Sequence, residues 1–333
     1  MEFSLRGEDL TLLLRYPESV CIRLNGKYLR AQSRLRGLDT LTAFTVTADD
    51  ALDEFFAVTL SGPVLYFKGA TGKIKVTLEE NTISFSDSMV IVTLPITRDI
   101  VADFDIPDFD AEDARPVPKK TRYGLRSMMA TMTEIAKELV DYSGNRVTIK
   151  DKKATYINHS MLLECLADLP DMCVSTTSLN NMLTLTNNAE ELAVYDAGEY
   201  VIFFTSDIVI RIMKDDNVNT LTADALMGRG QGEIETTTVK CLGQAKRFAG
   251  LSSFRDSNTA SLTYNENAIG VSMRGNGYNI TSSVNGRTII INPRVLIVLG
   301  KFLASDEYTI ERGLKHICLS IPDRKLVICA TSY

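Results

Sequence analysis

The sequence has little of what most enzymes and metal-binding proteins need. It has only two histidines, His159 and His316, and neither has a cysteine, an aspartate or another histidine at the spacing of a metal site. The six cysteines are scattered without a Cys-x-x-Cys pair, so we expect reduced thiols buried in the core. No nucleophile–base pair stands out, and the glycines at 228–232 lack the lysine and hydroxyl residue of a phosphate-binding loop. The sequence therefore predicts a protein without catalysis, cofactor or bound metal.

Long apolar runs and an excess of positive charge are also absent. No apolar run reaches the ~18 residues of a membrane span, and residues 1–15 lack the features of a signal peptide. We therefore expect a cytoplasmic or nuclear protein. The 36 Lys and Arg residues are outnumbered by 42 Asp and Glu, which gives a net charge of −6. This balance argues against a protein that coats DNA with its whole surface, but it allows a basic patch on one face.

One supersecondary unit, a strand followed by a short apolar helix and three more strands, recurs along the chain. In its last copy Asn292-Pro293 opens the helix, and apolar residues follow at helical spacing. The helix openings of the three copies fall at Pro63, Ser178 and Pro293, 115 residues apart both times (178 − 63 and 293 − 178). Equal spacing of one unit indicates an internal repeat.

A second helix and a hairpin begin each third of the chain. We predict these helices at residues 5–16, 128–142 and 239–251, the last of them capped by Thr236–Thr238. Asn25-Gly26 gives the first hairpin the strongest short turn signal. Each third then holds two copies of a helix with its antiparallel strands. The predicted fold class is α+β, with the helices on one face of each sheet.

Two polar segments separate the thirds. Asp103–Arg126 is acidic and contains prolines before a basic cluster, and Asp215–Gly232 is rich in glycine at its end. The acidic residues of the first segment could in principle hold a divalent cation, but they lack the glycine turn and final glutamate of a calcium loop. We read both segments as connectors. The predicted domains are residues 1–115, 116–222 and 223–333.

This pattern resembles the DNA polymerase sliding clamp of the three-domain bacterial beta-clamp type. The last third carries the resemblance in detail, through Arg247–Leu251, Ile290–Leu296 and the apolar C-terminal stretch Val327–Tyr333. The chain departs from the family in the middle domain. There Tyr195–Val201 keeps little of the family's Ala-Thr-Asp-Gly-aromatic/His-Arg-Leu-Ala motif, which is typical of a divergent clamp such as a phage would encode.

The resemblance implies a closed ring whose inner wall is made of the helices and through which duplex DNA passes. Such a wall needs cations that touch phosphates without reading bases. Lys240 and Arg247 are seven residues apart and share a face of the predicted helix, as do Arg294 and Lys301. The alternative is that these are ordinary solvated cations on surface helices. The full candidate set for DNA binding is Arg6, Lys68, Arg126, Lys137, Lys240, Arg247, Arg294 and Lys301.

The family also has an apolar pocket beside the C-terminal strand, where partner proteins dock short peptides. On the matching strand Val327, Cys329 and Thr331 would share one side, with Tyr333 at the end. Leu226 and Met227 of the second connector are candidates for the opposite wall. The alternative is that Val327 and Cys329 are ordinary core of a terminal strand.

The function implied is that of a non-enzymatic processivity factor that encircles duplex DNA and tethers a DNA polymerase. The implied partners are double-stranded DNA, the polymerase, a clamp loader and a second copy of the chain. In the homodimer, domain 1 of each chain would contact domain 3 of the other, so that edge strands pair across the boundary and the ring closes. Two alternatives stay open: an open or monomeric DNA-binding processivity factor, and a structural protein, built from the same repeat, that does not bind DNA.

Overall fold

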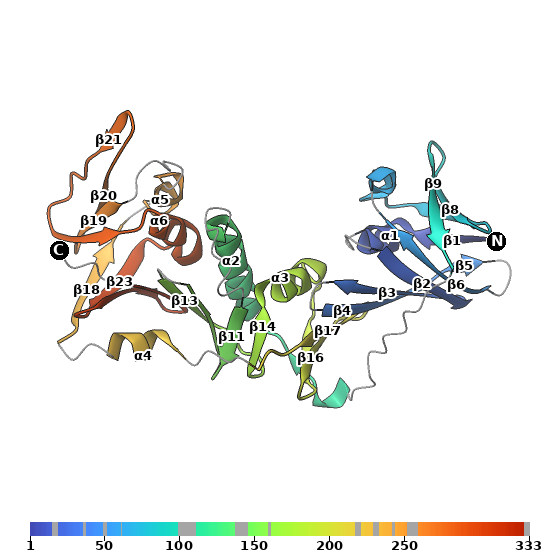
Figure 1. The fold of residues 1–333 in the computed structure, drawn as a ribbon, viewed down its shortest axis with the longest axis horizontal. Coiled ribbons are helices and arrows are strands. Elements are labelled where there is room, and N and C mark those ends of the chain that lie inside the picture. Colours follow the sequence, from blue (N-terminus) through green and yellow to red (C-terminus); the bar gives the residue numbers. More distant parts are fainter. Residues whose placement is uncertain are drawn as a thin grey trace. The chain divides into compact units, whose positions relative to one another are not determined.

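A computed structural model describes residues 1–14, 19–35, 38–48, 52–60, 62–98, 111–136, 146–158, 161–216, 221–228, 233–241, 244–251 and 259–329. The fold is mixed α and β, as predicted, with antiparallel sheets and short helices (Figure 1). The chain forms two compact units. Unit 1 combines Met1–Val117 with Thr177–Lys214, and unit 2 combines Pro118–Thr176 with Asp215–Tyr333. Within the described ranges, no helix is long and apolar enough to cross a membrane.

Unit 1 is built on one antiparallel sheet of 13 strands. In sheet order they are β10 (Arg115–Pro116), β15 (Ala193–Asp196), β16 (Tyr200–Phe204), β17 (Ile208–Met213), β4 (Leu38–Thr45), β3 (Tyr28–Leu35), β2 (Ser19–Gly26), β6 (Leu52–Thr59), β9 (Ile91–Thr97), β8 (Thr82–Ser86), β7 (Lys73–Leu78), β1 (Glu2–Arg6) and β5 (Thr47–Ala48). Its helices are α1 (Gly7–Leu13), η1 (Gly62–Phe67), η2 (Ala111–Asp113) and α3 (Thr176–Leu185). α1 packs against β1 and η1.

The hairpin of β2 and β3 shows how sequence sets local structure in this unit. Asn25 pairs with Tyr28, and Gly26 turns the chain with φ = 57°. A positive φ is what the tight hairpin turn requires and what glycine allows. Along β2 the buried residues Val20, Ile22 and Leu24 alternate with more exposed ones, so one face of the strand enters the core.

Unit 2 contains an eight-stranded and a four-stranded sheet, both antiparallel. The larger has the order β14 (Met172–Ser175), β11 (Arg146–Lys150), β12 (Lys153–Ile157), β13 (Met161–Leu166), β25 (Arg324–Cys329), β24 (His316–Ile321), β23 (Glu307–Arg312) and β18 (Glu235–Lys240). The smaller has the order β21 (Tyr278–Ile280), β20 (Ala268–Gly275), β19 (Ala260–Asn265) and β22 (Arg287–Ile291). The helices are α2 (Lys119–Ala136), α4 (Ala223–Gly228), α5 (Ala245–Leu251), α6 (Val295–Ile297) and its π-helical continuation η3 (Val298–Leu303).

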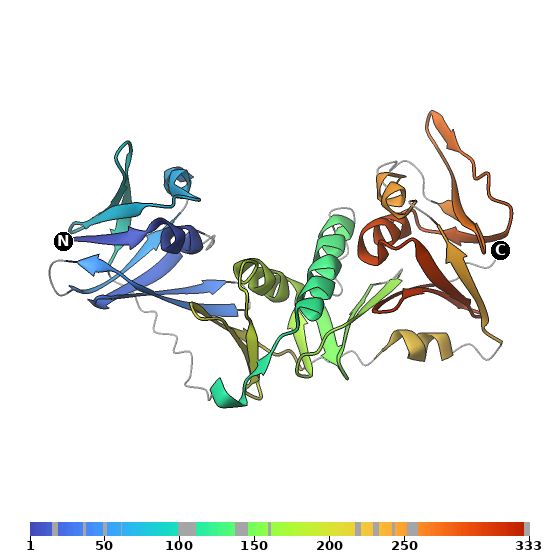
Figure 2. The same cartoon turned by 180° about the vertical axis from the view of Figure 1, so that it is seen from behind.

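The prediction that helices lie on one face of each sheet is wrong for the eight-stranded sheet, because helices cover both of its faces. On one face α2 packs on β13, η3 packs on β25, and α5 lies against α6 and η3 (Figure 2). On the other face α4 packs across β13, β25 and β24 (Figure 1). Side chains alternate accordingly: Leu162 and Val327 meet α4, whereas Cys165 lies beside Gly124 of α2.

The repeated strand–helix step is confirmed. Helices begin at Gly62, Thr176 and Val295, within two residues of the predicted openings at Pro63, Ser178 and Pro293. The sequence pattern also predicts three strands after each helix, among them residues 82–86, 208–213 and 316–321, and these three strands have the same bounds in the structure. The division into three domains of residues 1–115, 116–222 and 223–333 stays a prediction.

A helix overlaps each range predicted at the start of a third, but the predicted first residue of the helix was wrong in every case. Residues 2–6 form β1, so the first helix starts at Gly7. α2 starts at Lys119, nine residues earlier than predicted, so the basic end of the first connector is helical. The predicted helix at 239–251 is split, because residues 235–240 form β18 and the helix begins at Ala245. The β-branched run from Thr236 to Val239 favours a strand, since branched side chains fit a pleated surface.

Candidate nucleic-acid interface and apolar cluster

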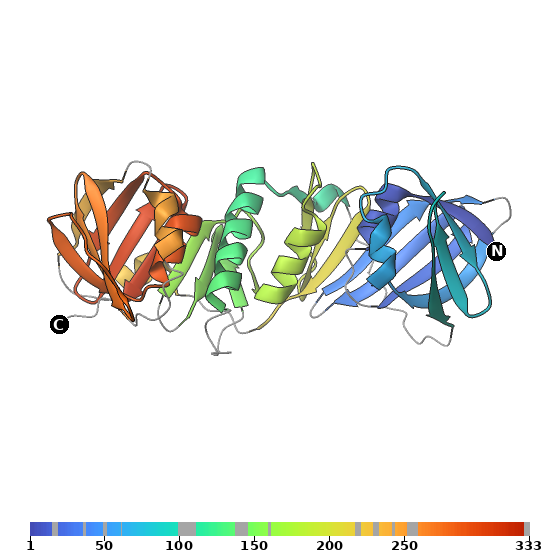
Figure 3. The ribbon, with the colours of Figure 1, turned by 90° about the horizontal axis from the view of Figure 1, so that it is seen from above.

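Basic residues are concentrated on the helices that share one face of unit 2. Seen from above, α2, α5 and α6 lie along this face (Figure 3). Within the bounds of α2, α5, α6 and η3 there is one carboxylate, Glu134. The cations on the same helices are Lys119, Lys120, Arg122, Arg126, Lys246, Arg247 and Lys301. In a chain with a net charge of −6, this helical face is a local excess of positive charge.

The helices described in unit 1 have no such excess. α1 carries Glu8 and Asp9 and no cation, and η1 and α3 carry no charged residue. The basic surface is therefore a property of unit 2.

Three of the predicted DNA contacts lie on the basic helices. Arg247 is exposed on α5, and Lys301 is exposed on η3, where its ammonium forms an ion pair with Glu134 of α2. Arg126 lies half-buried within α2, and burial together with the neighbouring Arg122 lowers its pKa. A guanidinium stays protonated at neutral pH despite such a shift.

Two further predicted contacts, Lys240 and Arg294, do not lie within a helix. Lys240 lies on strand β18 opposite Glu307, so it does not share a helical face with Arg247. Arg294 immediately precedes α6 and is half-buried, and its backbone N–H donates to Oδ1 of Asn292 at 3.0 Å.

In unit 1, Arg6 ends β1 and donates to both carboxylate oxygens of Asp9 at 2.8 Å, which neutralises much of its charge. Lys68 lies in the turn after η1 and is exposed. Lys137 lies outside the described residues.

Three exposed cations of this surface lie on helices but were not predicted to do so. Lys119 and Lys120 were assigned to a connector, and Lys246, beside Arg247, was not singled out. The signal for the first two was present, because Pro118 immediately precedes a run of good helix formers and proline is favoured at the start of a helix.

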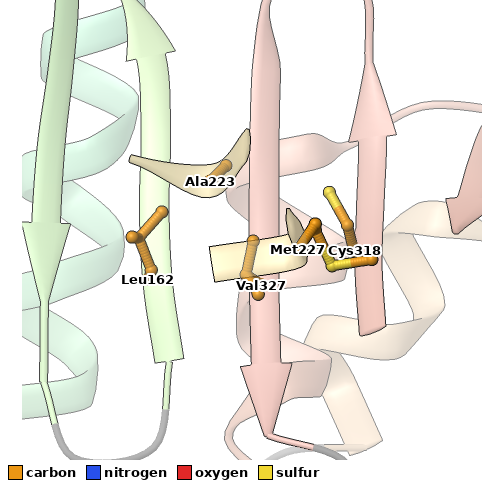
Figure 4. Packing of buried hydrophobic residues seen from close by; sticks show 5 residues of the cluster. All are labelled: Leu162, Ala223, Met227, Cys318 and Val327. Carbon is orange, nitrogen blue, oxygen red and sulfur yellow. The ribbon is translucent and has the colours of Figure 1, made fainter. Parts of the chain in front are cut away.

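The predicted pocket residues that the structure describes come together in one apolar cluster. Val327 of β25 and Met227 of α4 are buried together with Leu162, Ala223 and Cys318 (Figure 4). Partly buried side chains packed against this cluster are Ile157, Leu221 and Leu226. The side chain of Cys329, and Thr331 and Tyr333, lie outside the described part of the chain.

A network of charged groups borders the apolar cluster. Asp224 of α4 accepts hydrogen bonds from Nζ of Lys153 at 3.0 Å and Nζ of Lys325 at 2.6 Å. Glu164, which is buried in β13, accepts the backbone N–H of Ala223 at 3.0 Å and lies 3.5 Å from Nζ of Lys153. The hydrogen bonds from Lys325 and Lys153 lower the pKa of Asp224, so its carboxylate is ionised at neutral pH.

The described residues contain no group of three or more His, Cys, Asp or Glu side chains that could hold a metal ion. His316 begins β24, whereas His159 and the acidic residues at 103–110 lie outside the described ranges.

Solved structures with the same arrangement are bacterial replication proteins. The Helicobacter pylori beta clamp bound to a DNA ligase peptide aligns over 100% of both chains with a TM-score of 0.70 at 11% identity. The DNA polymerase III subunit beta from Pseudomonas aeruginosa and the beta subunit from DNA polymerase of Streptococcus pyogenes also align over 100% of both chains, with TM-scores of 0.71 and 0.72, each at 13% identity. The chain has the sliding-clamp fold. No protein-family model matches the sequence, and no curated protein matches it, so the sliding-clamp likeness is one of structure.

Proposed function

We propose that the protein is a sliding clamp: a non-enzymatic processivity factor that encircles duplex DNA and tethers a DNA polymerase in a bacterial or phage-infected cell. The observation that carries the proposal is the basic helical face of unit 2 in an acidic chain of sliding-clamp fold. Cations that contact phosphates alone give binding without sequence preference, which movement along the duplex requires.

Closure into a ring is supported by an open strand edge in unit 1. β9 pairs with β8 from Ile91 to Pro95 but pairs with β6 only at Ile96 and Thr97. The other edge of its first half therefore has no strand partner in the described part of the chain. Ile91 is 72% exposed there and Met89, just before the strand, is 80% exposed. An open apolar edge is a template for pairing with another chain.

The last third also has an outer strand with an open edge. β21 is the outer strand of the four-stranded sheet and pairs, among the described strands, with β20 alone. We infer that β9 of one chain pairs with β21 of a second copy and that the reciprocal contact closes a head-to-tail homodimer.

The apolar surface around Val327, which α4 covers through Met227, is the proposed site for peptides of partner proteins, among them the polymerase and a clamp loader. The Helicobacter pylori clamp of the same fold binds a DNA ligase peptide. The cluster lies on the face of the eight-stranded sheet opposite the basic helices, so peptide and DNA would not compete for one surface.

Retention on circular DNA tests this function. The protein is incubated with nicked circular and linear duplexes of equal length, with a polymerase-associated clamp loader and ATP where spontaneous loading is slow, and bound protein is measured after gel filtration. A ring stays on circular DNA and slides off linear ends. Equal loss from both would contradict encirclement and favour an open DNA-binding factor, and no retention on either would favour a structural protein.

Charge variants locate the DNA surface. We expect replacement of Lys119, Lys120, Lys246 and Arg247 by Gln to weaken retention. The salt dependence should also flatten, by about 0.9 in the log–log slope for each phosphate that the variant no longer neutralises. A matched control replaces four exposed cations that lie off these helices, Lys73, Lys152, Arg274 and Lys315. Equal effects of both sets would show that only net charge matters and would refute the proposed interface.

A further inference from the structure

α4 is a short helix held in place by what it covers. It has six residues, too few for a helix to be stable in water on its own, so packing must maintain it. Ala223 and Met227 are its buried residues, and both pack on the apolar side chains of the sheet below (Figure 4). The opposite side of α4 faces solvent, as the exposed Ala225 shows.

Ionic contacts fix one end of this helix to the sheet. Asp224 forms ion pairs with Lys153 of β12 and with Lys325 of β25. Glu164 of β13 accepts a hydrogen bond from the backbone N–H of Ala223. The Asp224 side chain is 62% exposed, so water and salt weaken these ion pairs. The attachment of α4 therefore combines a small apolar contact with two ion pairs. In these ion pairs a carboxylate of another chain could take the place of Asp224.

We propose that α4 is an internal ligand of this surface, and that partner peptides with an acidic residue near an apolar one bind by displacing it. The surface consists of Leu162, Cys318 and Val327 with the ammonium groups of Lys153 and Lys325. Asp224 and Met227 are three residues apart on one side of the helix, which gives the carboxylate-to-apolar spacing that a competing peptide reproduces. The inference rests on the proposed peptide site and adds its regulation and the chemistry of its ligand.

Cysteine alkylation measures displacement of α4 directly. Cys318 lies beneath α4, whereas Cys165 lies on the opposite face of the same sheet beside Gly124 of α2. Burial raises the pKa of each thiol to about 12, so both react slowly while they are covered, and Cys165, which α4 does not cover, is an internal control. In native protein at pH 8, Asp224→Ala should raise the labelling rate of Cys318 by iodoacetamide about fivefold and leave that of Cys165 unchanged. Asp168→Ala, which breaks an exposed ion pair with Lys152 away from α4, should change neither rate.

Peptide binding tests the surface itself. The probe is a fluorescent synthetic peptide of residues 221–228, added to the full-length protein and followed by anisotropy. Asp224→Ala and Met227→Ala in the protein weaken the resident helix without touching the surface, so each should raise probe affinity about fivefold. Lys325→Ala also releases α4 and should speed Cys318 labelling, but it should lower probe affinity because it removes a binding group.

These opposite effects separate a displaceable ligand from a structural helix. A structural role predicts that Asp224→Ala and Lys325→Ala act alike, and that result would overturn the inference. So would a probe that binds no variant, or unchanged Cys318 labelling in Asp224→Ala. Retention on circular DNA is measured on the same preparations: if retention holds and the α4 variants have no effect, the inference fails while the clamp function stands.

Discussion

Gly7 marks the point where β1 turns into α1, and the turn leaves no room for a side chain. A Cβ at this position would lie 2.1 Å from the carbonyl oxygen of Ala70, and the Gly7 N–H donates to the carbonyl of Gly72 at 2.8 Å. We predict that Gly7→Ala lowers the free energy of unfolding by about 1–3 kcal/mol, because backbone must move to accept the methyl group. Urea unfolding followed by circular dichroism measures the change. Gly72→Ala is the control, since a Cβ there meets no atom within 4 Å, and equal losses of stability in both variants would contradict the close approach.

The conformation of a residue could be predicted from the sequence wherever its immediate neighbours determine it. The Asn25-Gly26 turn follows from the φ that the hairpin needs, and the sequence contains all of that information. The ion pair between Lys301 and Glu134 does not follow, because 167 residues separate the partners and only the folded chain brings them together. Because such partners are distant in sequence, candidate cations for a DNA surface could be chosen from the sequence. Which of these cations pairs with a carboxylate could not be predicted.

Among the elements, η3 ends in a strained conformation that substitution can relieve. Ala304 adopts the left-handed region with φ = 36°, and its N–H closes the last turn on the carbonyl of Leu299. We predict that Ala304→Gly stabilises unit 2 by about 0.5 kcal/mol, because relief of about 1 kcal/mol of strain exceeds the added freedom of the unfolded chain. Ala130→Gly, at an exposed position inside α2, should instead destabilise by about 1 kcal/mol. Thermal unfolding of the two variants should shift in opposite directions, and a lower midpoint for Ala304→Gly would refute the strain.

Strands after a clear turn were predicted better than helices. Alternation of apolar residues and a turn signal locate a hairpin from a few neighbouring residues, as for β11 and β12. The start of the helix predicted at 239–251 was wrong because apolar spacing over a short segment fits both the period of a helix and that of a strand. The β-branched threonines before Val239 favour the strand β18. α4 lay in a segment read as a connector, because six residues that pack through two side chains carry almost no periodic signal.

At the scale of the whole molecule, strand pairing joins parts of the chain that a repeat alone does not connect. β13 pairs with β25, and β17 pairs with β4, so the predicted middle domain contributes to both compact units. The spacing of 115 residues reveals the repeated unit, but the choice of which edge strands meet depends on side-chain fit between distant segments. The fold class could therefore be predicted, whereas the composition of each unit required the structure.

The open edge of β9 allows a direct test of whether two chains pair to form a ring. We predict that the wild-type chain has twice the 36.9 kDa mass of one chain in light scattering after size exclusion, and that Ile91→Lys shifts it to the single-chain mass. A lysine on an edge strand is charged and well hydrated, so pairing with a second chain would bury it without a partner. The control is Leu314→Lys, since Leu314 is 68% exposed but lies in the turn between β23 and β24. A dimer that survives Ile91→Lys, or one that Leu314→Lys dissociates equally well, would place the contact elsewhere, and a monomeric wild type would exclude a stable two-chain ring.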